Sequence, residues 1–189
     1  MGGTISRMKR EGSSIYVAAF SACQQSNEGF NLKKEFYAAM KQLGLDKTEC
    51  GILEFPVRNF PAYRQHILDN IITFKERMSP SVVFVPCTQD NHQDHQVVSN
   101  EAIRAFKNNS TLYGFVHHRN CLSVPQDHYV RLDTEDVDKK LAAIDCYESQ
   151  KQLRNTYLTD GAIESIMKTN GLACGADYAE VFQVIRVIK

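Results

Sequence analysis

Short apolar runs alternate along this chain with longer amphipathic segments, and this alternation limits the possible folds more than any other feature. We expect strands at 14–22, 51–57, 81–86 and 111–116, a short strand at 128–132 and a late strand at 178–188. We expect helices at 2–12, 31–44, 63–78, 97–107 and 134–150. Regular alternation of strands and helices predicts a mostly parallel sheet covered on both faces, an α/β fold of Rossmann type. The polar alternation of 178–188 is typical of a strand near a sheet edge.

Two of the expected helices have a clear inward face, defined by apolar side chains at helical spacing. In 31–44, which Gly44 is expected to stop, the inward residues are Leu32, Phe36, Met40 and Leu43. In 63–78 the inward residues are Ile67, Ile71, Phe74 and Met78. Thr134 is expected to cap the helix that follows it, because the acidic first turn suits the helix dipole.

Composition excludes several classes of protein. The 189 residues favour one domain, and 22 basic against 22 acidic side chains argue against a nucleic-acid partner or an anionic membrane surface. No apolar run has the length of a membrane span, and the first residues lack the apolar region of a secretory signal. Six scattered cysteines without a C-x-x-C pair indicate reduced thiols and a cytoplasmic location. Cys87 is either a small buried residue or a nucleophile or ligand.

The stretch TQDNHQDHQ (88–96) concentrates titratable side chains directly after the apolar run 81–86. Chemistry in parallel α/β sheets lies beyond the carboxyl ends of strands, so the position suits an active site. Imidazole binds zinc through one nitrogen while a carboxylate orients the other, which fits His95 with Asp90 or Asp94 beside it. His92 is then suited to donate a proton or a hydrogen bond to developing negative charge. The alternative is a polar loop whose histidines only cap the next helix.

Three more side chains follow other expected strands. His117 and His118 come after 111–116 and are expected either to line the same cleft or to lie on a solvated loop. Arg58 follows the strand at 51–57 and is expected to bind an anionic or hydroxylated substrate, or else to be an ordinary surface arginine. The sequence contains no G-x-G-x-x-G and no P-loop, so dinucleotide or nucleoside triphosphate binding has no support.

The motif HQDH (92–95), followed by VVSNEAIRAFKN, resembles the LmbE-like, or PIG-L, family of zinc-dependent N-deacetylases. The resemblance is to the bacterial sugar-modifying branch and spans 1–189 as a single domain, through GGTISRMKREGSSIYVAAFS, VRNFPAYRQHILDNI, PSVVFVP, KKLAAIDCYESQ and YAEVFQVIR. It implies a Rossmann-like three-layer sandwich and metal-dependent hydrolysis of the N-acetyl group of a sugar or related amine. It also implies that His95 is a zinc ligand and that His92 assists at the oxyanion and the leaving group. From their positions in the sequence we further expect Asp94 to be catalytic, and Arg58, His117 and His118 to contact substrate.

The sequence departs from the family pattern at its start. In the family, two further zinc ligands and the general base come from an Ala-His-Pro-Asp-Asp-Glu loop that precedes Gly-Gly-Thr, whereas here only Met1 precedes Gly2, Gly3 and Thr4. We therefore expect an N-terminally incomplete domain without its first central strand, and a gap between the strands at 14–22 and 81–86. We also expect weak or absent zinc binding and impaired or absent deacetylation, so enzyme activity is left open. The stretch GFVHHRNC (114–121) is a second departure.

Three explanations of this pattern stay open. The chain is a truncated or late-started form of a normal deacetylase, or a non-catalytic relative that binds sugar or serves assembly. The third explanation is a different metal site, built from His92, His95 and either His117 or His118. The expected partner is a small N-acetylated sugar, and a homo-oligomer is compatible with the sequence.

Overall fold

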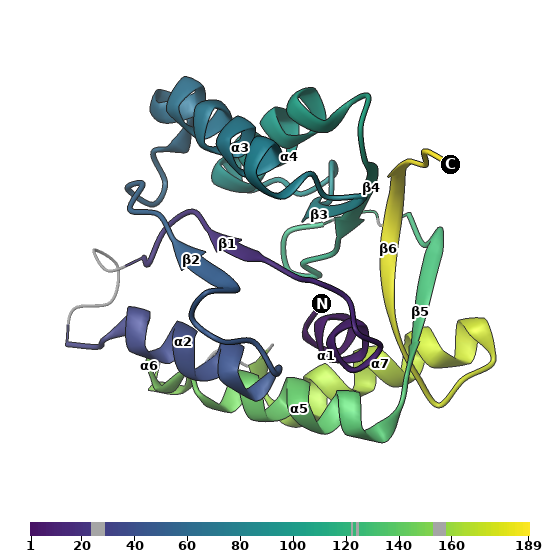
Figure 1. The fold of residues 1–189 in the computed structure, drawn as a ribbon. Coiled ribbons are helices and arrows are strands. Elements are labelled where there is room, and N and C mark those ends of the chain that lie inside the picture. The colour runs from purple at the N-terminus through teal and green to yellow at the C-terminus, as the bar shows by residue number, and fades with distance from the viewer. Residues whose placement is uncertain (24–28, 122, 124, 153–157) are drawn as a thin grey trace. The chain divides into compact units, whose positions relative to one another are not determined.

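The computed structural model describes residues 1–23, 29–121, 123, 125–152 and 158–189. Figure 1 shows the order of elements along the chain: α1 (Gly2–Arg10), β1 (Val17–Ala19), α2 (Leu32–Gln42), β2 (Cys50–Ile52), the 3-10 turn η2 (Phe60–Tyr63), α3 (Arg64–Met78), β3 (Val82–Pro86), α4 (Gln93–Phe106), β4 (Thr111–Phe115), β5 (His128–Leu132), α5 (Thr134–Asp145), α6 (Glu148–Gln152), α7 (Asp160–Cys174) and β6 (Tyr178–Arg186). The chain forms two compact units, one from Met1–Glu54 with Tyr129–Glu180 and one from Phe55–His128 with Val181–Lys189. The predicted α/β class is confirmed.

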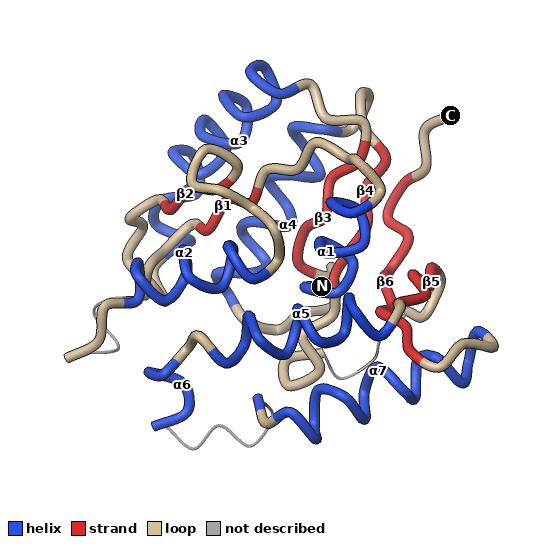
Figure 2. The backbone as a smooth tube through the Cα atoms, turned by 60° about the horizontal axis from the view of Figure 1, so that its bottom comes forward, coloured by secondary structure: helices blue, strands red, loops and turns tan. Residues whose placement is uncertain are grey.

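The second unit is built on a parallel pair of strands. β3 and β4 run side by side (Figure 2), and their register places Val82 opposite Thr111 and Pro86 opposite Phe115. β6 pairs antiparallel with β4 and lies between β4 and β5 in the order β3-β4-β6-β5. The strand expected near a sheet edge at 178–188 is therefore one place in from the edge, with β5 outside it. One of its polar residues, Gln183, has a partner within the protein, since it accepts the Thr88 N–H at 2.9 Å.

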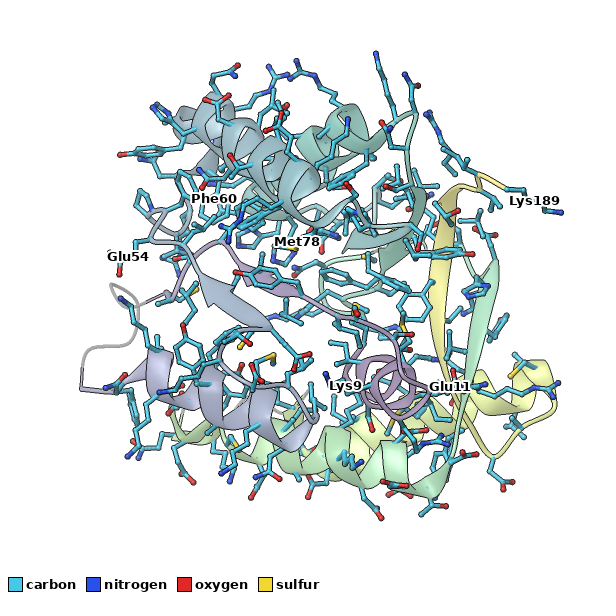
Figure 3. The ribbon with its side chains drawn as sticks, viewed as in Figure 1. Lys9, Glu11, Glu54, Phe60, Met78 and Lys189 are labelled. Atoms are coloured by element: carbon cyan, nitrogen blue, oxygen red, sulfur yellow. The ribbon has the colours of Figure 1, made fainter. Side chains whose placement is uncertain are left out.

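Helices α3 and α4 of the second unit pack against each other, and α4 also contacts β3. The fully buried carboxylate of Glu101 on α4 binds the guanidinium groups of Arg64 and Arg104, so its charge is compensated. Ile67 and Ile71 are buried as expected, whereas Met78 is 37% exposed at the last residue of α3 (labelled in Figure 3). The inward assignment of Met78 was wrong, because the apolar face of α3 is covered along Ile67, Leu68 and Ile71 and the helix end is not.

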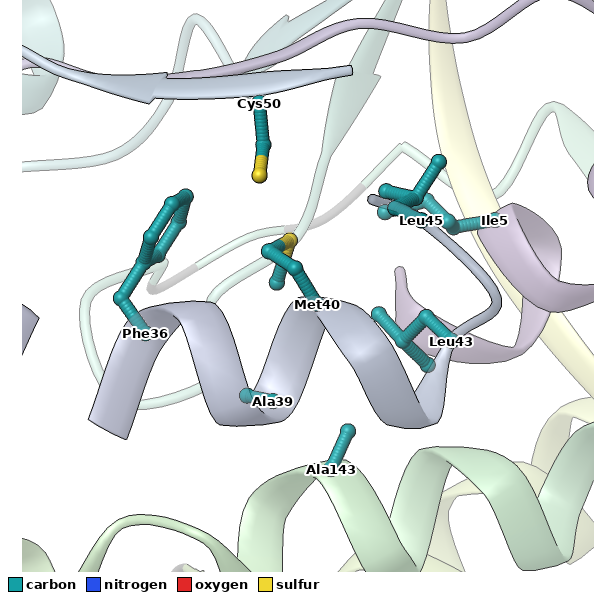
Figure 4. Packing of buried hydrophobic residues seen from close by; sticks show 8 residues of the cluster. All are labelled: Ile5, Phe36, Ala39, Met40, Leu43, Leu45, Cys50 and Ala143. Atoms are coloured by element: carbon teal, nitrogen blue, oxygen red, sulfur yellow. The ribbon is translucent and has the colours of Figure 1, made fainter. Parts of the chain in front are cut away.

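The first unit has its core around α2. The inward residues predicted for this helix, Leu32, Phe36, Met40 and Leu43, are all buried. Figure 4 shows the cluster to which this helix contributes: Ile5, Phe36, Ala39, Met40, Leu43, Leu45, Cys50 and Ala143. Asn31 caps the start of α2 by accepting the Lys34 N–H at 3.0 Å, and Gly44 ends it with a left-handed φ of 84°.

A different residue from the one expected caps α5. The cap is Asp133, not Thr134, because Asp133 and Asp136 form a capping box in which each side chain accepts the other's backbone N–H. Asp136 is fully buried and also accepts hydrogen bonds from Ser6 Oγ at 2.9 Å and Arg10 Nη2 at 2.8 Å. This carboxylate therefore ties α1 to α5 within the first unit.

The strands belong to two sheets in the described part of the chain. β1 pairs in parallel with β2 alone, with Val17 opposite Cys50, and β3 belongs to the four-stranded sheet. The strands expected at 14–22 and 81–86 therefore belong to different sheets. None of the helices within the described residues combines the length and apolarity that crossing a bilayer needs.

Candidate functional site

The candidate site lies in the second unit, where β3 and β4 end at the same sheet edge. Beyond the last strand pair, the Cys87 N–H donates to the Phe115 carbonyl at 2.9 Å. Further along, the Asn91 N–H donates to the Asn120 carbonyl at 3.2 Å, and Asp90 and Cys121 form an isolated antiparallel bridge. The segment 88–96 is thus fastened to the loop after β4 by backbone hydrogen bonds, which brings the two groups of histidines onto one edge.

Asp90 is the carboxylate that orients His95. It is 1% exposed, its Oδ1 accepts the His92 N–H at 2.8 Å, and its Oδ2 lies 2.7 Å from His95 Nδ1. A carboxylate only accepts hydrogen bonds, so the ring nitrogen that faces it must donate one. The hydrogen of neutral His95 therefore lies on Nδ1. His95 Nε2 therefore carries a lone pair, which is the state that a metal ligand needs.

His92 has the opposite hydrogen-bonding state. It is the N-cap residue of α4, and its Nδ1 accepts the Asp94 N–H at 3.2 Å. An accepting Nδ1 places the hydrogen of the neutral ring on Nε2, which is then a donor. The two rings are stacked with centroids 4.7 Å apart and planes 26° apart. The site therefore presents one imidazole lone pair and one imidazole N–H side by side. His92 also caps the helix, which is the role that the alternative interpretation gave to the histidines.

Asp94 and Arg58 are joined through the backbone. Asp94 is 3% exposed and accepts the Arg58 N–H at 2.5 Å and the Phe60 N–H at 3.1 Å. Gln93 Nε2 donates to the Arg58 carbonyl at 2.6 Å. Arg58 has a left-handed φ of 65°, a conformation that costs a residue with a Cβ about 1–2 kcal/mol, and its side chain is exposed. The first turn of α4 thus fixes the loop that carries this arginine.

The structure brings His117 to the site. Its ring lies edge-on to His95, with centroids 6.1 Å apart and planes 62° apart. Burial, and in second place the nearby His95, lower the pKa of His117, which favours the neutral ring. His118 is exposed at the next position of the same loop. Of this pair, His117 is therefore the residue that the structure places beside the motif.

One supporting side chain, Gln183, was not among the residues predicted from the sequence. Gln183 on β6 accepts the Thr88 N–H at 2.9 Å through Oε1 and donates to Thr88 Oγ1 at 2.8 Å through Nε2. Gly114 leaves room for this contact, because a Cβ there would lie 2.9 Å from Gln183 Oε1. For the carboxylate that orients His95, the sequence left Asp90 and Asp94 as alternatives, and the structure places Asp90 there. The alternating polar pattern of β6 was the only sequence signal for Gln183.

The donor atoms at the candidate site meet only part of the needs of a metal ion. His95 Nε2, held by a buried carboxylate behind it, fits one ligand of a zinc site. Within residues 1–23, 29–121, 123, 125–152 and 158–189, no group of three or more His, Cys, Asp or Glu side chains is placed to hold a metal ion. The described residues therefore fit part of a metal site and not a whole one.

Solved structures share the fold over nearly the whole chain. The conserved protein TT1542 from Thermus thermophilus superposes with a TM-score of 0.79 at 25% identity, covering 100% of this chain and 89% of that chain. The N,N'-diacetylchitobiose deacetylase from Pyrococcus horikoshii superposes at 0.72 with 20% identity, covering 98% and 78%. GalB, the 4-carboxy-2-hydroxymuconate hydratase from Pseudomonas putida KT2440, superposes at 0.73 with 21% identity, covering 100% and 91%. The fold thus serves a deacetylase and a hydratase, so side chains must decide the reaction.

A comparison of the sequence with protein families identifies the family of this chain. The family model of GlcNAc-PI de-N-acetylases (PIG-L) matches residues 1–106, which include α1 and the whole motif from Asp90 to His95. This match covers more than half of the 189 residues. The chain therefore belongs to the PIG-L family of de-N-acetylases.

Proposed function

We propose that this chain carries the histidine part of an N-deacetylase site that acts on an N-acetylated sugar or a related amine. The observation that carries the proposal is the opposed state of the stacked rings of His92 and His95. Amide hydrolysis needs an electrophile at the carbonyl and a hydrogen-bond donor for the oxyanion and the leaving nitrogen. A His95 lone pair fixed by Asp90 suits the first need, and the His92 Nε2 hydrogen suits the second.

The remaining side chains have supporting roles in this proposal. His95 is one protein ligand of a divalent ion, zinc by family resemblance and by the preference of zinc for imidazole. Arg58, His117 and His118 contact the sugar from the two loops that flank the motif. Both oxygens of Asp94 accept backbone N–H groups, so we assign it a positioning role within the site.

We extend the proposal to the whole chain as a single deacetylase domain in the cytoplasm. The family match at 1–106 contains residues of both compact units, which supports one domain. Free thiols are found at Cys50, Cys87, Cys121, Cys146 and Cys174, which supports a reducing compartment.

A second candidate function is sugar binding without catalysis. It is favoured by one observation, the absence of a three-residue donor group among the residues that the structure describes. In this case zinc has no role and the His92 N–H, with Arg58, serves recognition alone. The third explanation, a site that includes His117 or His118, requires that the His117→Ala/His118→Ala double variant loses metal.

The test compares two proteins, the 189-residue chain and a form extended upstream by a strand and the Ala-His-Pro-Asp-Asp-Glu loop of the family. Both are dialysed against zinc, their metal content is measured, and amine release from a panel of N-acetylated sugars is followed. We expect the extended form to bind zinc and release amine, and His92→Ala and His95→Ala to abolish release. No amine from either protein would refute deacetylation. Sugar binding by the metal-free chain that His92→Ala abolishes would then establish the binding function.

A further inference from the structure

Arg58 is held in a backbone conformation that arginine does not favour. Its φ of 65° lies in the left-handed region, which glycine occupies without a steric penalty. The residue at this position nevertheless carries a long cationic side chain that is exposed. No hydrogen bond or ion pair joins its guanidinium group to another residue in the described part of the chain, so local contacts do not explain the choice of arginine.

Hydrogen bonds from the first turn of α4 hold Arg58 in its left-handed backbone conformation. Asp94 accepts the N–H groups on both sides of the bend, from Arg58 at 2.5 Å and from Phe60 at 3.1 Å. Gln93 donates to the Arg58 carbonyl at 2.6 Å, so both polar backbone atoms of Arg58 are bound by adjacent residues of one helix turn. Phe60 is 5% exposed and packs edge-on against Phe55, which anchors the far side of the bend.

The same helix turn carries the two site histidines. His92 precedes Gln93 and His95 follows Asp94, so the residues that bind Arg58 lie between those of the candidate site. A fixed left-handed residue is found where surrounding structure over-determines it, and such residues cluster at ligand-binding positions. The arrangement ties the backbone of Arg58 to the turn that carries the histidines.

We propose that Asp94 is a positioning residue for Arg58: by clamping the left-handed backbone at residue 58 it fixes the guanidinium as a hydrogen-bond donor to the sugar hydroxyls. The ligand part of this inference rests on the proposed function. The clamp part concerns the backbone alone and is measurable without ligand.

The clamp is tested by amide hydrogen exchange followed by NMR on the metal-free chain. Asp94→Asn replaces one carboxylate oxygen by an amide that cannot accept, so we expect exchange at Arg58 and Phe60 to rise at least about tenfold. Asp69→Asn, the same change at an exposed position of α3, is expected to leave both amides unchanged. Unchanged exchange at Arg58 and Phe60 in Asp94→Asn would overturn the clamp.

The role of the clamp in binding is tested by a double-mutant cycle with N-acetyl-D-glucosamine as the probe, titrated by NMR. Arg58→Gly keeps the backbone conformation and removes the guanidinium, and we expect it to weaken binding about tenfold. Asp94→Asn is expected to weaken binding similarly in the native background and less than about twofold in the Arg58→Gly background. Fully additive effects would overturn the proposal, because Asp94 would then act independently of Arg58.

The two measurements separate the clamp from the proposed function. If the unaltered chain does not bind the sugar at all, the sugar-binding role of Arg58 is refuted together with the proposed function. In that case the exchange rates still decide whether Asp94 holds the backbone at residue 58. If sugar binds and Arg58→Gly has no effect, the proposed function stands and the inference about Arg58 fails.

Discussion

Asp90 Oδ2 lies 2.7 Å from His95 Nδ1, and the other oxygen of the same buried carboxylate holds the backbone N–H of His92. One carboxylate therefore sets both the ring orientation of one histidine and the backbone of the other. A change at Asp90 should for this reason affect both histidines of the motif.

Replacing Asp90 by asparagine should disturb the protonation state of His95. An amide nitrogen facing Nδ1 would make that atom an acceptor and move the hydrogen to Nε2, removing the ligand lone pair. We expect the NMR shifts of the His95 ring nitrogens to report the other tautomer, and the zinc affinity of the extended protein to fall about 10- to 100-fold. We also expect a loss of about 1–3 kcal/mol in the free energy of unfolding. A His95 ring that keeps its hydrogen on Nδ1 in Asp90→Asn would contradict this account.

Two substitutions at His92 should separate its capping role from its chemical role. His92→Ala removes the cap of α4 and should cost about 1 kcal/mol of stability. His92→Asn restores an accepting side chain at the N-cap, so its unfolding free energy should stay within about 0.5 kcal/mol of the native chain. Both variants should lower amide hydrolysis about 10²- to 10³-fold in the extended protein. An active His92→Asn variant would show that His92 only caps the helix.

His128 should make stability depend on pH. Burial lowers the pKa of His128 below its ordinary value of 6.5, and its ring stacks on Tyr113 with centroids 4.4 Å apart. Because the unfolded chain binds this proton more readily, the stability is fully present above 6.5 and is lost as the pH falls from 6.5 through the lowered pKa.

We therefore expect denaturant unfolding to show the native chain losing stability between about pH 7 and pH 5. His128→Phe keeps an aromatic ring against Tyr113 and should lose less over the same range. The pKa of His117 is lowered as well, so that variant should keep a residual dependence of its unfolding free energy on pH. Equal slopes for the two proteins would exclude His128 as a source of the pH dependence.

Gly114 should not tolerate alanine. A Cβ at this position would lie 2.9 Å from Gln183 Oε1 and 3.0 Å from Cys87 Cα, so the strand or the following loop must move. We expect Gly114→Ala to lower the unfolding free energy by about 1–3 kcal/mol. Gly161→Ala is the control: apart from its chain neighbours and the backbone of its own helix, no described atom lies within 4 Å of the added Cβ. Alanine also favours the helix, so stability should stay equal or rise. Equal effects at the two positions would show that crowding at Gly114 is unimportant.

Apolar periodicity predicted the regular elements well because each has a buried face. The inward residues of α2 and the short strand β5 are where the pattern placed them. Helix ends were less predictable, since they depend on side-chain hydrogen bonds: α4 begins at Gln93 and not at 97 because His92 caps it. Helix α7 (Asp160–Cys174) was not predicted at all, because its buried side is made mainly of Met167, Asn170 and Gly171 and gives little apolar signal.

Within the candidate site, local sequence indicated the residue types and not the pairings. Asp90 and Asp94 are both close enough in sequence to orient His95, and only the direction of each side chain at the helix start decides between them. Asp94 turns toward the backbone of Arg58, 36 residues earlier in the chain, and leaves His95 to Asp90. Such pairings between distant segments depend on the tertiary fold, which periodicity does not describe.

The contact between Gln183 and Thr88 can form only late in synthesis of the chain. The two residues are 95 positions apart, so during synthesis the loop before the motif leaves the ribosome long before the strand that holds it. Until Gln183 emerges, Thr88 has no partner on β6 and the order of the motif depends on the contacts of β3, β4 and α4 alone. At typical rates of about 5–20 residues per second, this interval lasts on the order of 5–20 s. A nascent chain would thus lack the contact of segment 88–96 with β6 for that time, so the states of His92 and His95 are best measured on chains that already contain β6.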